Sequence, residues 1–466
     1  LDLCYLKLIS KFLIENNEIR IYTNNISIFT YFQHTAIITF SDRLKFASKK
    51  FSNQLLPYKL LLGFILNSFI FRIFFVYTNN SKRLEDTILL QTYAGASNFQ
   101  EDTYKESYFG DLSKLLREKR NKKVLTWITF DKRPFLPNLI LKDLFSNNKT
   151  VNNYTKESFI SNLRHIREKK EKFIVMEDYL TFTDYFMAVK HFFMKRFSKL
   201  DSSFFEDSGI REIFLYHLKK EHIEYASLIY SFIKKLSENG SNKITFFQSF
   251  ENLHNEMAVI LGVRDHSLDS KIIGSFQTSK PSNLLSLEFT TTELSESIPK
   301  PDLIVFNSNV YRNFYERYGI PTIDGYAFRQ EYIKILHFDE ETYDDDTLLV
   351  IFSGDSQEII WQVQLLREIP ERLKILVKFH PLYQFDLDGI WNKNHYKILD
   401  NNALNKVLSK KPKVLSTYSM LALECATLGL DVGLAYNKKR LIFNPFDSTN
   451  IKNYSLISNQ EEMNKF

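Results

Sequence analysis

Apolar and polar residues alternate most regularly in the last quarter of the chain. Several short runs of Val, Leu and Ile there are followed by an amphipathic stretch that suits a helix. The pattern predicts strands at Leu348–Phe352, Lys374–Lys378, Lys397–Leu399, Val414–Ser416 and Val432–Ala435, and helices at Glu358–Leu366, Asn402–Ser409 and Ser419–Leu428. Strands that alternate with helices are typical of a parallel sheet.

The earlier part of the chain shows the same alternation less cleanly. Apolar runs predict strands at Glu18–Tyr22, Thr35–Phe40, Thr87–Thr92, Lys123–Phe130, Phe173–Glu177, Ile244–Gln248, Lys271–Phe276 and Leu303–Asn307. Amphipathic patterns predict helices at Tyr104–Arg120, Ile210–Leu236 and Val310–Tyr318. They also predict one helix that ends at Phe197 and another that begins at Met257. We therefore expect an α/β chain with two Rossmann-like lobes and a cleft between them.

A turn-rich acidic stretch, His337–Thr347, separates the two patterns. A chain of 466 residues is too long for one ordinary core. We therefore expect a first domain at residues 1–336 and a second at 347–466. The run Asp344–Asp346 lies in this linker, where a solvated acidic turn is the simplest interpretation.

The most apolar segment is Leu60–Tyr77. It suits a buried or partner-facing helix, a helix lying in a membrane interface, or a short transmembrane span. Arg72 would be costly in the middle of a bilayer, so we expect peripheral membrane contact without a span.

Composition excludes several classes of protein. The net charge of +6 comes from 61 basic and 55 acidic residues spread along the chain, which does not suggest a nucleic-acid partner. Two cysteines cannot form a disulfide framework or a Cys-rich metal site, and they fit a reducing cytoplasm. The 13 glycines include no G-x-G pair, so the dinucleotide fingerprint and the P-loop are both missing, and we expect no cofactor. The apolar start at Leu1 has no charged leader or cleavage site, so we expect no signal peptide.

Two polar sets stand where predicted strands of the second domain end. The first is Lys378 and His380, directly before Pro381, and the second is Ser416, Thr417 and Ser419 at a helix start. Loops at the carboxyl ends of parallel strands and helix N-termini bind phosphate groups. The sequence therefore predicts a nucleotide-phosphate site here, although a surface ion pair, a core histidine and a helix cap remain the structural alternatives.

Carboxylates and histidine in the first domain are candidates for a general base. Glu251, our first choice, lies with His254 and Glu256 on a loop after a predicted strand, where catalytic groups are often found. Gln277 and Asp102 are further candidates on this side. A hydrogen bond that orders the loop is the structural alternative for Glu251.

The Lys-x-His-Pro motif, the Ser/Thr-rich turn and the Ala-Leu-Glu helix resemble the donor half of GT-B glycosyltransferases. They are most similar to enzymes that use CMP-activated acidic sugars, such as bacterial sialyl and Kdo transferases. Four segments of the first domain also resemble a bacterial family assigned to surface carbohydrate biosynthesis: Tyr108–Leu112, Phe250–Glu256, Ile272–Gln277 and Pro301–Val305.

This resemblance implies a metal-independent GT-B enzyme that moves a sugar from a CMP-linked donor to a surface glycan or a lipid-linked acceptor. It implies that the first domain is the acceptor side, that the second binds the nucleotide sugar, and that Glu424 contacts the ribose. A surface position for Glu424 stays open. Two alternatives remain, a polyol-phosphate transferase of the CDP-glycerol type and a catalytically inactive GT-B-like scaffold that binds glycan. We expect a cytoplasmic protein, at the inner face of the membrane.

Overall fold

We describe the chain from a computed structural model. The structure describes residues 20–23, 37–40, 61, 83–94, 99–100, 103–104, 106, 108–120, 123–130, 173–197, 224–266, 269–280, 288–289, 299–308, 311–330, 332–333, 336–339, 347–367, 369, 372–380, 385–387, 390–392, 395–400, 403–438, 443–447 and 449–466.

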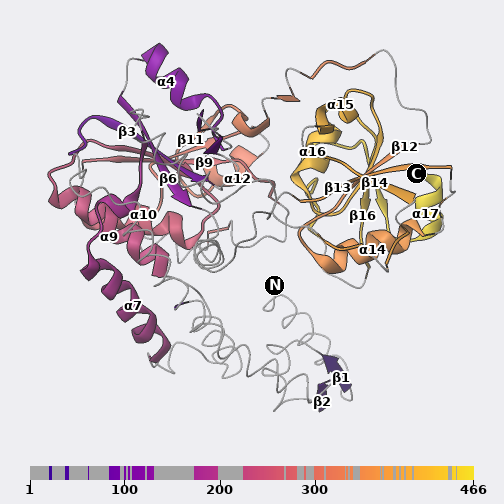
Figure 1. The fold of residues 1–466 in the computed structure, drawn as a ribbon, viewed down its shortest axis with the longest axis horizontal. Coiled ribbons are helices and arrows are strands. Elements are labelled where there is room, and N and C mark those ends of the chain that lie inside the picture. The colour runs from indigo at the N-terminus through magenta and orange to yellow at the C-terminus, as the bar shows by residue number, and fades with distance from the viewer. Residues whose placement is uncertain are drawn as a thin grey trace, which may run out of the picture.

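The first lobe is built on a seven-stranded sheet with the order β11-β10-β9-β8-β3-β6-β7 (Figure 1). Every neighbouring pair in this sheet is parallel. Its strands are β3 (Thr87–Ala94), β6 (Lys123–Phe130), β7 (Phe173–Ile174), β8 (Thr245–Ser249), β9 (Lys271–Phe276), β10 (Leu303–Phe306) and β11 (Thr322–Asp324).

Five α-helices of the described residues belong to this lobe. They are α4 (Leu112–Arg120), α7 (Phe182–Phe197), α9 (Glu224–Glu238), α10 (His254–Asp265) and α12 (Arg312–Glu316), with short 3-10 helices at Met176–Asp178 and Phe328–Gln330. Helices α9 and α10 pack together on one face, where Phe232, Ile233 and Val259 are fully buried. The packing is close, because a Cβ added at Gly262 would lie 3.0 Å from Cβ of Ile233.

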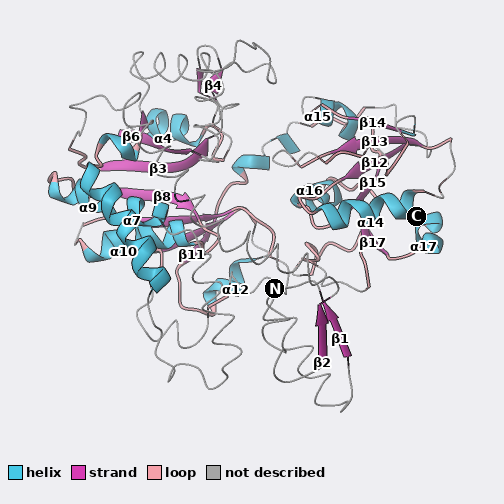
Figure 2. Cartoon of the chain, turned by 60° about the horizontal axis from the view of Figure 1, so that its bottom comes forward, coloured by secondary structure: helices cyan, strands magenta, loops and turns pink. Residues whose placement is uncertain are grey.

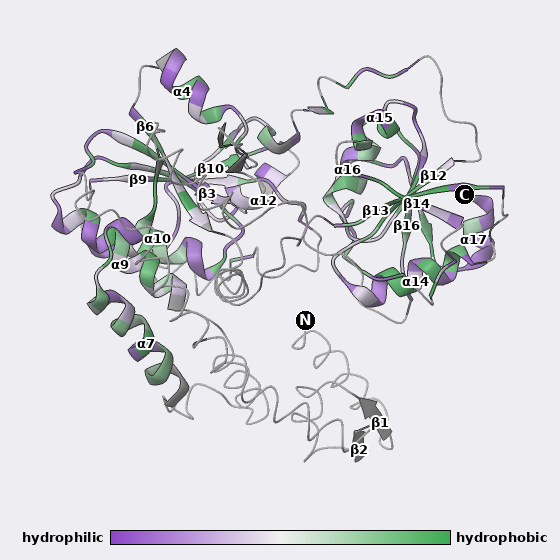
Figure 3. Cartoon of the chain, in the orientation of Figure 1, coloured by the Kyte–Doolittle hydropathy of each residue, from purple (hydrophilic) through white to green (hydrophobic). Residues whose placement is uncertain are grey.

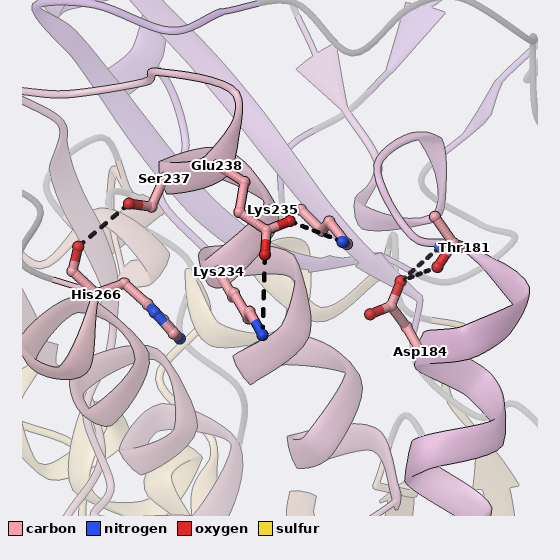
Figure 4. Close-up of polar contacts among 7 residues, drawn as sticks. All are labelled: Thr181, Asp184, Lys234, Lys235, Ser237, Glu238 and His266. Atoms are coloured by element: carbon pink, nitrogen blue, oxygen red, sulfur yellow. Dashed lines mark hydrogen bonds and ion pairs between the residues drawn. The ribbon is translucent and has the colours of Figure 1, made fainter.

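Polar contacts fix the ends of these helices (Figure 4). Asp184, in the first turn of α7, accepts from the backbone N–H and the hydroxyl of Thr181, both at 2.6 Å. The Ser237 hydroxyl, near the end of α9, donates to the carbonyl of His266 at 3.2 Å and so ties the ends of α9 and α10 together. These hydrogen bonds satisfy backbone groups at the helix ends and fix how the ends are oriented.

The second lobe has a six-stranded parallel sheet with the order β14-β13-β12-β15-β16-β17 (Figure 2). Its strands are β12 (Thr347–Ile351), β13 (Lys374–Lys378), β14 (Tyr396–Ile398), β15 (Lys413–Ser416), β16 (Val432–Ala435) and β17 (Tyr454–Ile457). Its helices are α14 (Ser356–Leu366), α15 (Leu404–Leu408), α16 (Met420–Thr427) and α17 (Gln460–Lys465).

The second sheet is buried on both faces. One core contains Val350, Val363 and Val377, and the other contains Leu349, Val414 and Ala422. The central strands are therefore almost continuously hydrophobic, while α14 and α17 carry polar residues on their outer sides (Figure 3). The predicted fold class is confirmed, because both halves are parallel α/β sheets with covering helices, which is the Rossmann-like arrangement.

The segment between the two sheets packs on the second lobe. Tyr332 and Leu336 lie against the core that contains Leu349. Further along, the Ser409 hydroxyl donates to Asp339 at 2.8 Å. The predicted domain boundary itself stays a prediction, and the acidic run Asp344–Asp346 lies outside the described residues.

Several local predictions need correction or fall outside the structure. The helix predicted at Tyr104–Arg120 begins only at Leu112, because Glu106 accepts from the N–H groups of Tyr108 and Phe109 and holds a turn there. Short strands β4 (Phe99–Gln100) and β5 (Thr103–Tyr104) form an antiparallel pair before that turn. Near the amino terminus, β1 (Arg20–Thr23) pairs in parallel with β2 (Ile37–Phe40).

The apolar segment Leu60–Tyr77 lies outside the described residues apart from Leu61. Within the part of the chain that the structure describes, no helix is long and apolar enough to cross a bilayer. Peripheral membrane contact therefore stays a prediction.

Candidate functional site

The two predicted donor sets meet at the carboxyl edge of the second sheet. Ile351, the last residue of the central strand β12, pairs with Lys378 on one side and with Ser416 on the other. Lys378 and Ser416 are therefore at the same height, two strand spacings or about 10 Å apart in the backbone. Residues separated by 38 positions in sequence thus end at one edge, which is where open α/β sheets bind ligands.

Lys378 is a buried cation at this edge. It is 7% exposed, and its ammonium group donates to the carbonyl of Phe379 at 2.7 Å. Among the described residues, no carboxylate forms an ion pair with it. Burial lowers the pKa of Lys378, because the charged form is poorly solvated there. An incoming phosphate group would supply the negative charge that its surroundings do not.

His380 lies two residues after Lys378 in the sequence, and its side chain is exposed. It lies just past the end of β13 and forms contacts within the chain. Its position at the open end of the strand suits a group that meets a ligand, since an exposed imidazole can donate or accept at neutral pH.

The three hydroxyls of the second set have different surroundings. Ser416 is fully buried, and its hydroxyl donates to the carbonyl of Ile351 at 3.4 Å. Ser419 caps α16, because its oxygen accepts from the N–H of Leu421 at 3.2 Å. Thr417 is 3% exposed, and its hydroxyl has no hydrogen-bond partner among the described residues. Thr417 is therefore the hydroxyl of this set that is left for a ligand.

Glu424 lies on α16 behind this loop and is already hydrogen-bonded. The Gln330 side chain donates to one carboxylate oxygen at 3.2 Å, and the Tyr332 hydroxyl donates to the other. Burial raises the pKa of Tyr332, and the charge of Glu424 raises it further. Glu424 thus ties the segment between the two sheets to the second lobe, and a contact with ribose stays a prediction.

The acceptor-side candidates follow β8 and β9 in the first sheet. Glu251 is partly exposed on the loop after β8, and His254 is exposed at the first residue of α10. Gln277, directly after β9, is buried, and its side-chain nitrogen donates to the hydroxyl of Ser275 at 2.9 Å. Its side-chain oxygen has no partner among the described residues. Asp102 lies outside the described residues.

Glu256 differs from Glu251 in its burial. It is 1% exposed, and its carboxylate accepts from the Ser249 hydroxyl and from the N–H groups of Glu251 and Leu253. Burial raises the pKa of Glu256 to about 8. A carboxylate that solvent does not reach cannot take a proton from an acceptor, so the partly exposed Glu251 is the better placed of the two.

A row of hydroxyls on three adjacent strands was not anticipated from the sequence. Ser249 of β8 pairs with Ser275 of β9, and Thr92 stands next along on β3. The Thr92 hydroxyl donates to Glu106 at 2.6 Å. Serine and threonine at the last positions of the strands Thr87–Ala94 and Thr245–Ser249 were the available signal, because a buried strand seldom ends in polar residues without a partner.

The two lobes meet beside these residues. Burial raises the pKa of Tyr418, a hydrogen bond with the Ser279 side chain opposes this, and the charge of Glu251 raises it further. Tyr418 directly follows Thr417 in the second lobe, whereas Ser279 and Glu251 belong to the first lobe. The loop that carries Thr417 therefore contacts the first lobe at Ser279, and the charge of Glu251 acts on Tyr418. In the part of the chain that the structure describes, no group of three or more His, Cys, Asp or Glu side chains is placed to hold a metal ion.

No protein-family model matches the sequence, and no curated protein is significantly similar to it. Several solved structures match at low sequence identity. A UDP-GlcNAc 2-epimerase from Neisseria meningitidis, bound to UDP-GlcNAc, is 9% identical, with a TM-score of 0.42 over 81% of this chain and 89% of that chain. The wall teichoic acid polymerase TagF with CDPG is 11% identical, with a TM-score of 0.36 over 90% and 87%. The glycosyltransferase SnogD from Streptomyces nogalater is 9% identical, with a TM-score of 0.35 over 81% and 88%.

Proposed function

We propose that this chain is a GT-B-type glycosyltransferase that moves a sugar from a nucleotide-activated donor, with CMP-sugars favoured, to a surface glycan or a lipid-linked acceptor. The observation that carries the proposal is the position of two residues at one sheet edge. Lys378 ends β13, and Thr417 directly follows Ser416, the last residue of β15; both strands flank β12. One is a buried cation without a carboxylate partner, and the other is a buried hydroxyl without any partner, among the described residues.

This edge offers what a departing nucleotide phosphate needs. The ammonium of Lys378 supplies positive charge, and the Thr417 hydroxyl and the first N–H groups of α16 supply hydrogen bonds. His380, at the exposed end of β13, can donate a further bond to the phosphate as negative charge develops on it. These groups neutralise the phosphate without a metal ion, so we expect metal-independent transfer and no cofactor.

Glu251 completes the reaction on the acceptor side. As the acceptor oxygen forms a bond to the anomeric carbon, the bond from that carbon to the phosphate oxygen breaks, and its electron pair leaves with CMP. The proton of the acceptor hydroxyl passes to the Glu251 carboxylate. His254 and Gln277, which follow β8 and β9 in the same sheet, are further candidates for contact with the acceptor. We place this activity in the cytoplasm at the inner face of the membrane, where a membrane-bound acceptor would be reached.

Nucleotide binding tests this proposal directly. Thermal unfolding of the purified chain is followed with CMP, CDP, UDP and GDP in buffer that contains EDTA. We expect cytidine nucleotides to raise the melting temperature, and Thr417→Val to weaken this effect. Thr427→Val is the matched control, because its hydroxyl donates to the Leu423 carbonyl at the far end of the same helix. A requirement for Mg²⁺, or a clear preference for UDP, would contradict the proposal.

The same edge also suits the phosphate of a CDP-linked polyol, and phosphorus balance separates the two reactions. A transfer from a CMP-sugar leaves all donor phosphorus in CMP, whereas a polyol-phosphate transfer moves one phosphorus atom to the acceptor. Incubation with a donor labelled at phosphorus distinguishes them by where the label is found. A chain that binds nucleotide but transfers neither group would be a glycan-binding scaffold.

A further inference from the structure

The loop between β8 and α10 is held by one buried carboxylate. Glu256, in the first turn of α10, accepts from the backbone N–H of Glu251 at 2.7 Å and from that of Leu253 at 3.0 Å. Its other oxygen accepts from the Ser249 hydroxyl at 3.2 Å. A single side chain therefore binds the strand end, the start of the loop and the start of the helix.

The backbone of this loop is also constrained from both sides. Phe250 donates its N–H to the carbonyl of Ser275 at 2.9 Å. Its side chain also packs closely against Gly274, because a Cβ added at position 274 would lie 2.8 Å from Cβ of Phe250. Asn252 has a φ of 58°, a left-handed conformation that is uncommon for residues other than glycine. Such a conformation persists only when the surrounding contacts fix it, and it often occurs at functional loops.

We infer that Glu256 is a positioning residue of the acceptor side, because it fixes the loop that places the Glu251 carboxylate beside the donor loop. Glu256 itself is 1% exposed and cannot reach a substrate. Glu251 is the group on this loop that is partly exposed and near Tyr418. Since Glu251 acts as a base only if the chain is a transferase, the inference rests on the proposed function.

Three variants test it. Glu256→Ala removes the acceptor of both N–H groups. Glu256→Gln keeps an oxygen that accepts from both, and its amide nitrogen can donate to the Ser249 hydroxyl. Glu462→Ala is the matched control in the second lobe, because Glu462 accepts in the same way from the backbone N–H and the hydroxyl of Ser458, at 2.6 and 2.9 Å.

The first readout is amide hydrogen exchange, which does not depend on activity. In Glu256→Ala we expect exchange at the amides of Glu251 and Leu253 to accelerate by about tenfold or more, since each loses its hydrogen bond. In Glu256→Gln and in Glu462→Ala these two amides should exchange as in the parent. Parent-like exchange in Glu256→Ala would overturn the inference.

The second readout is steady-state transfer. We expect kcat of Glu256→Ala to fall about tenfold or more, with the KM for donor changed by less than about twofold, and Glu256→Gln to restore kcat. If Glu256→Ala does not fold, Glu256→Asp, one methylene shorter, carries the same expectations. A parent-like kcat in Glu256→Ala (or in Glu256→Asp, if that replaces it), while Glu251→Gln is inactive, would overturn the inference and leave the proposed function intact. A parent that neither binds nucleotide nor transfers would overturn the proposed function, and the inference with it.

Discussion

Replacing Glu256 by glutamine should remove a pH dependence from the stability of the fold. The pKa of Glu256 is raised by burial from 4.5 to about 8 in the folded chain. Between these pH values the folded chain keeps the proton that the unfolded chain releases. The free energy of unfolding therefore falls as pH rises through this window. The contribution of the Glu256 proton to stability is fully present only below about pH 4.5.

The size of the effect follows from the shift. A change of about 3.5 units, from 4.5 to about 8, corresponds to a free energy on the order of 5 kcal/mol, at 1.36 kcal/mol per unit. Glutamine has no proton to lose, so Glu256→Gln should be free of this contribution. The charge of Glu251, which contributes to the raised pKa of Glu256, remains in the variant.

Urea unfolding at intervals between pH 5 and pH 9 measures this. The difference in unfolding free energy between Glu256→Gln and the parent should grow by several kcal/mol from the lower to the upper limit, in favour of the variant. Glu462→Gln is the control, because hydrogen bonds from Ser458 lower the pKa of Glu462 below its usual value. This carboxyl group therefore titrates below the window, and the curve of Glu462→Gln should stay parallel to that of the parent between pH 5 and pH 9. Parallel curves for the parent and Glu256→Gln would refute the reasoning.

Three further substitutions probe other parts of the account. Tyr332→Phe removes the hydroxyl that donates to Glu424, and a lost bond to a charged group should lower the free energy of unfolding by about 1.5–3 kcal/mol; an unchanged urea midpoint would contradict this. Gly274→Ala places a Cβ at 2.8 Å from Cβ of Phe250, so we expect a loss of about 1–3 kcal/mol and a lower melting temperature; a parent-like melting curve would show that the loop yields freely. Ser419→Ala removes the cap of α16 and should cost about 1 kcal/mol in urea unfolding, whereas a variant as stable as the parent would show that water replaces the cap.

The sequence predicted the parallel sheets well where the hydrophobic pattern is strong. The predicted strands at Lys374–Lys378 and Val432–Ala435 have the observed bounds, because each has an apolar run that packs in the core of the second lobe. The pattern failed at Tyr104–Arg120, where the carboxylate of Glu106 holds a turn and delays the helix to Leu112. A side chain that accepts from its own backbone nearby leaves no mark in hydrophobic periodicity.

The sequence indicated the strand-end positions of the candidate residues, but not their burial or their tertiary contacts. The spacing of Lys378 and Ser416 relative to their strand ends indicated a shared edge, and the register of β12 with its two neighbours brings them to it. Burial cannot be read in the same way. Glu251 and Glu256 are both glutamates of the same predicted loop. One is partly exposed and the other is 1% exposed, a difference that depends on tertiary packing around the loop. The contact of Tyr332 with Glu424 was equally invisible, since 92 positions separate them.

Calorimetric titration with CMP in EDTA, on the parent and on two histidine variants, tests the central claim most directly. We expect the parent to bind, His380→Ala to bind about 10- to 100-fold more weakly, as for the loss of one charge-assisted hydrogen bond, and His395→Ala to bind as the parent does. His395 is the control, because it is exposed in the same lobe at the amino end of β14, opposite the proposed site. A parent that does not bind CMP, or a His380→Ala variant with the parent's Kd, would contradict the claim that this sheet edge is the donor site.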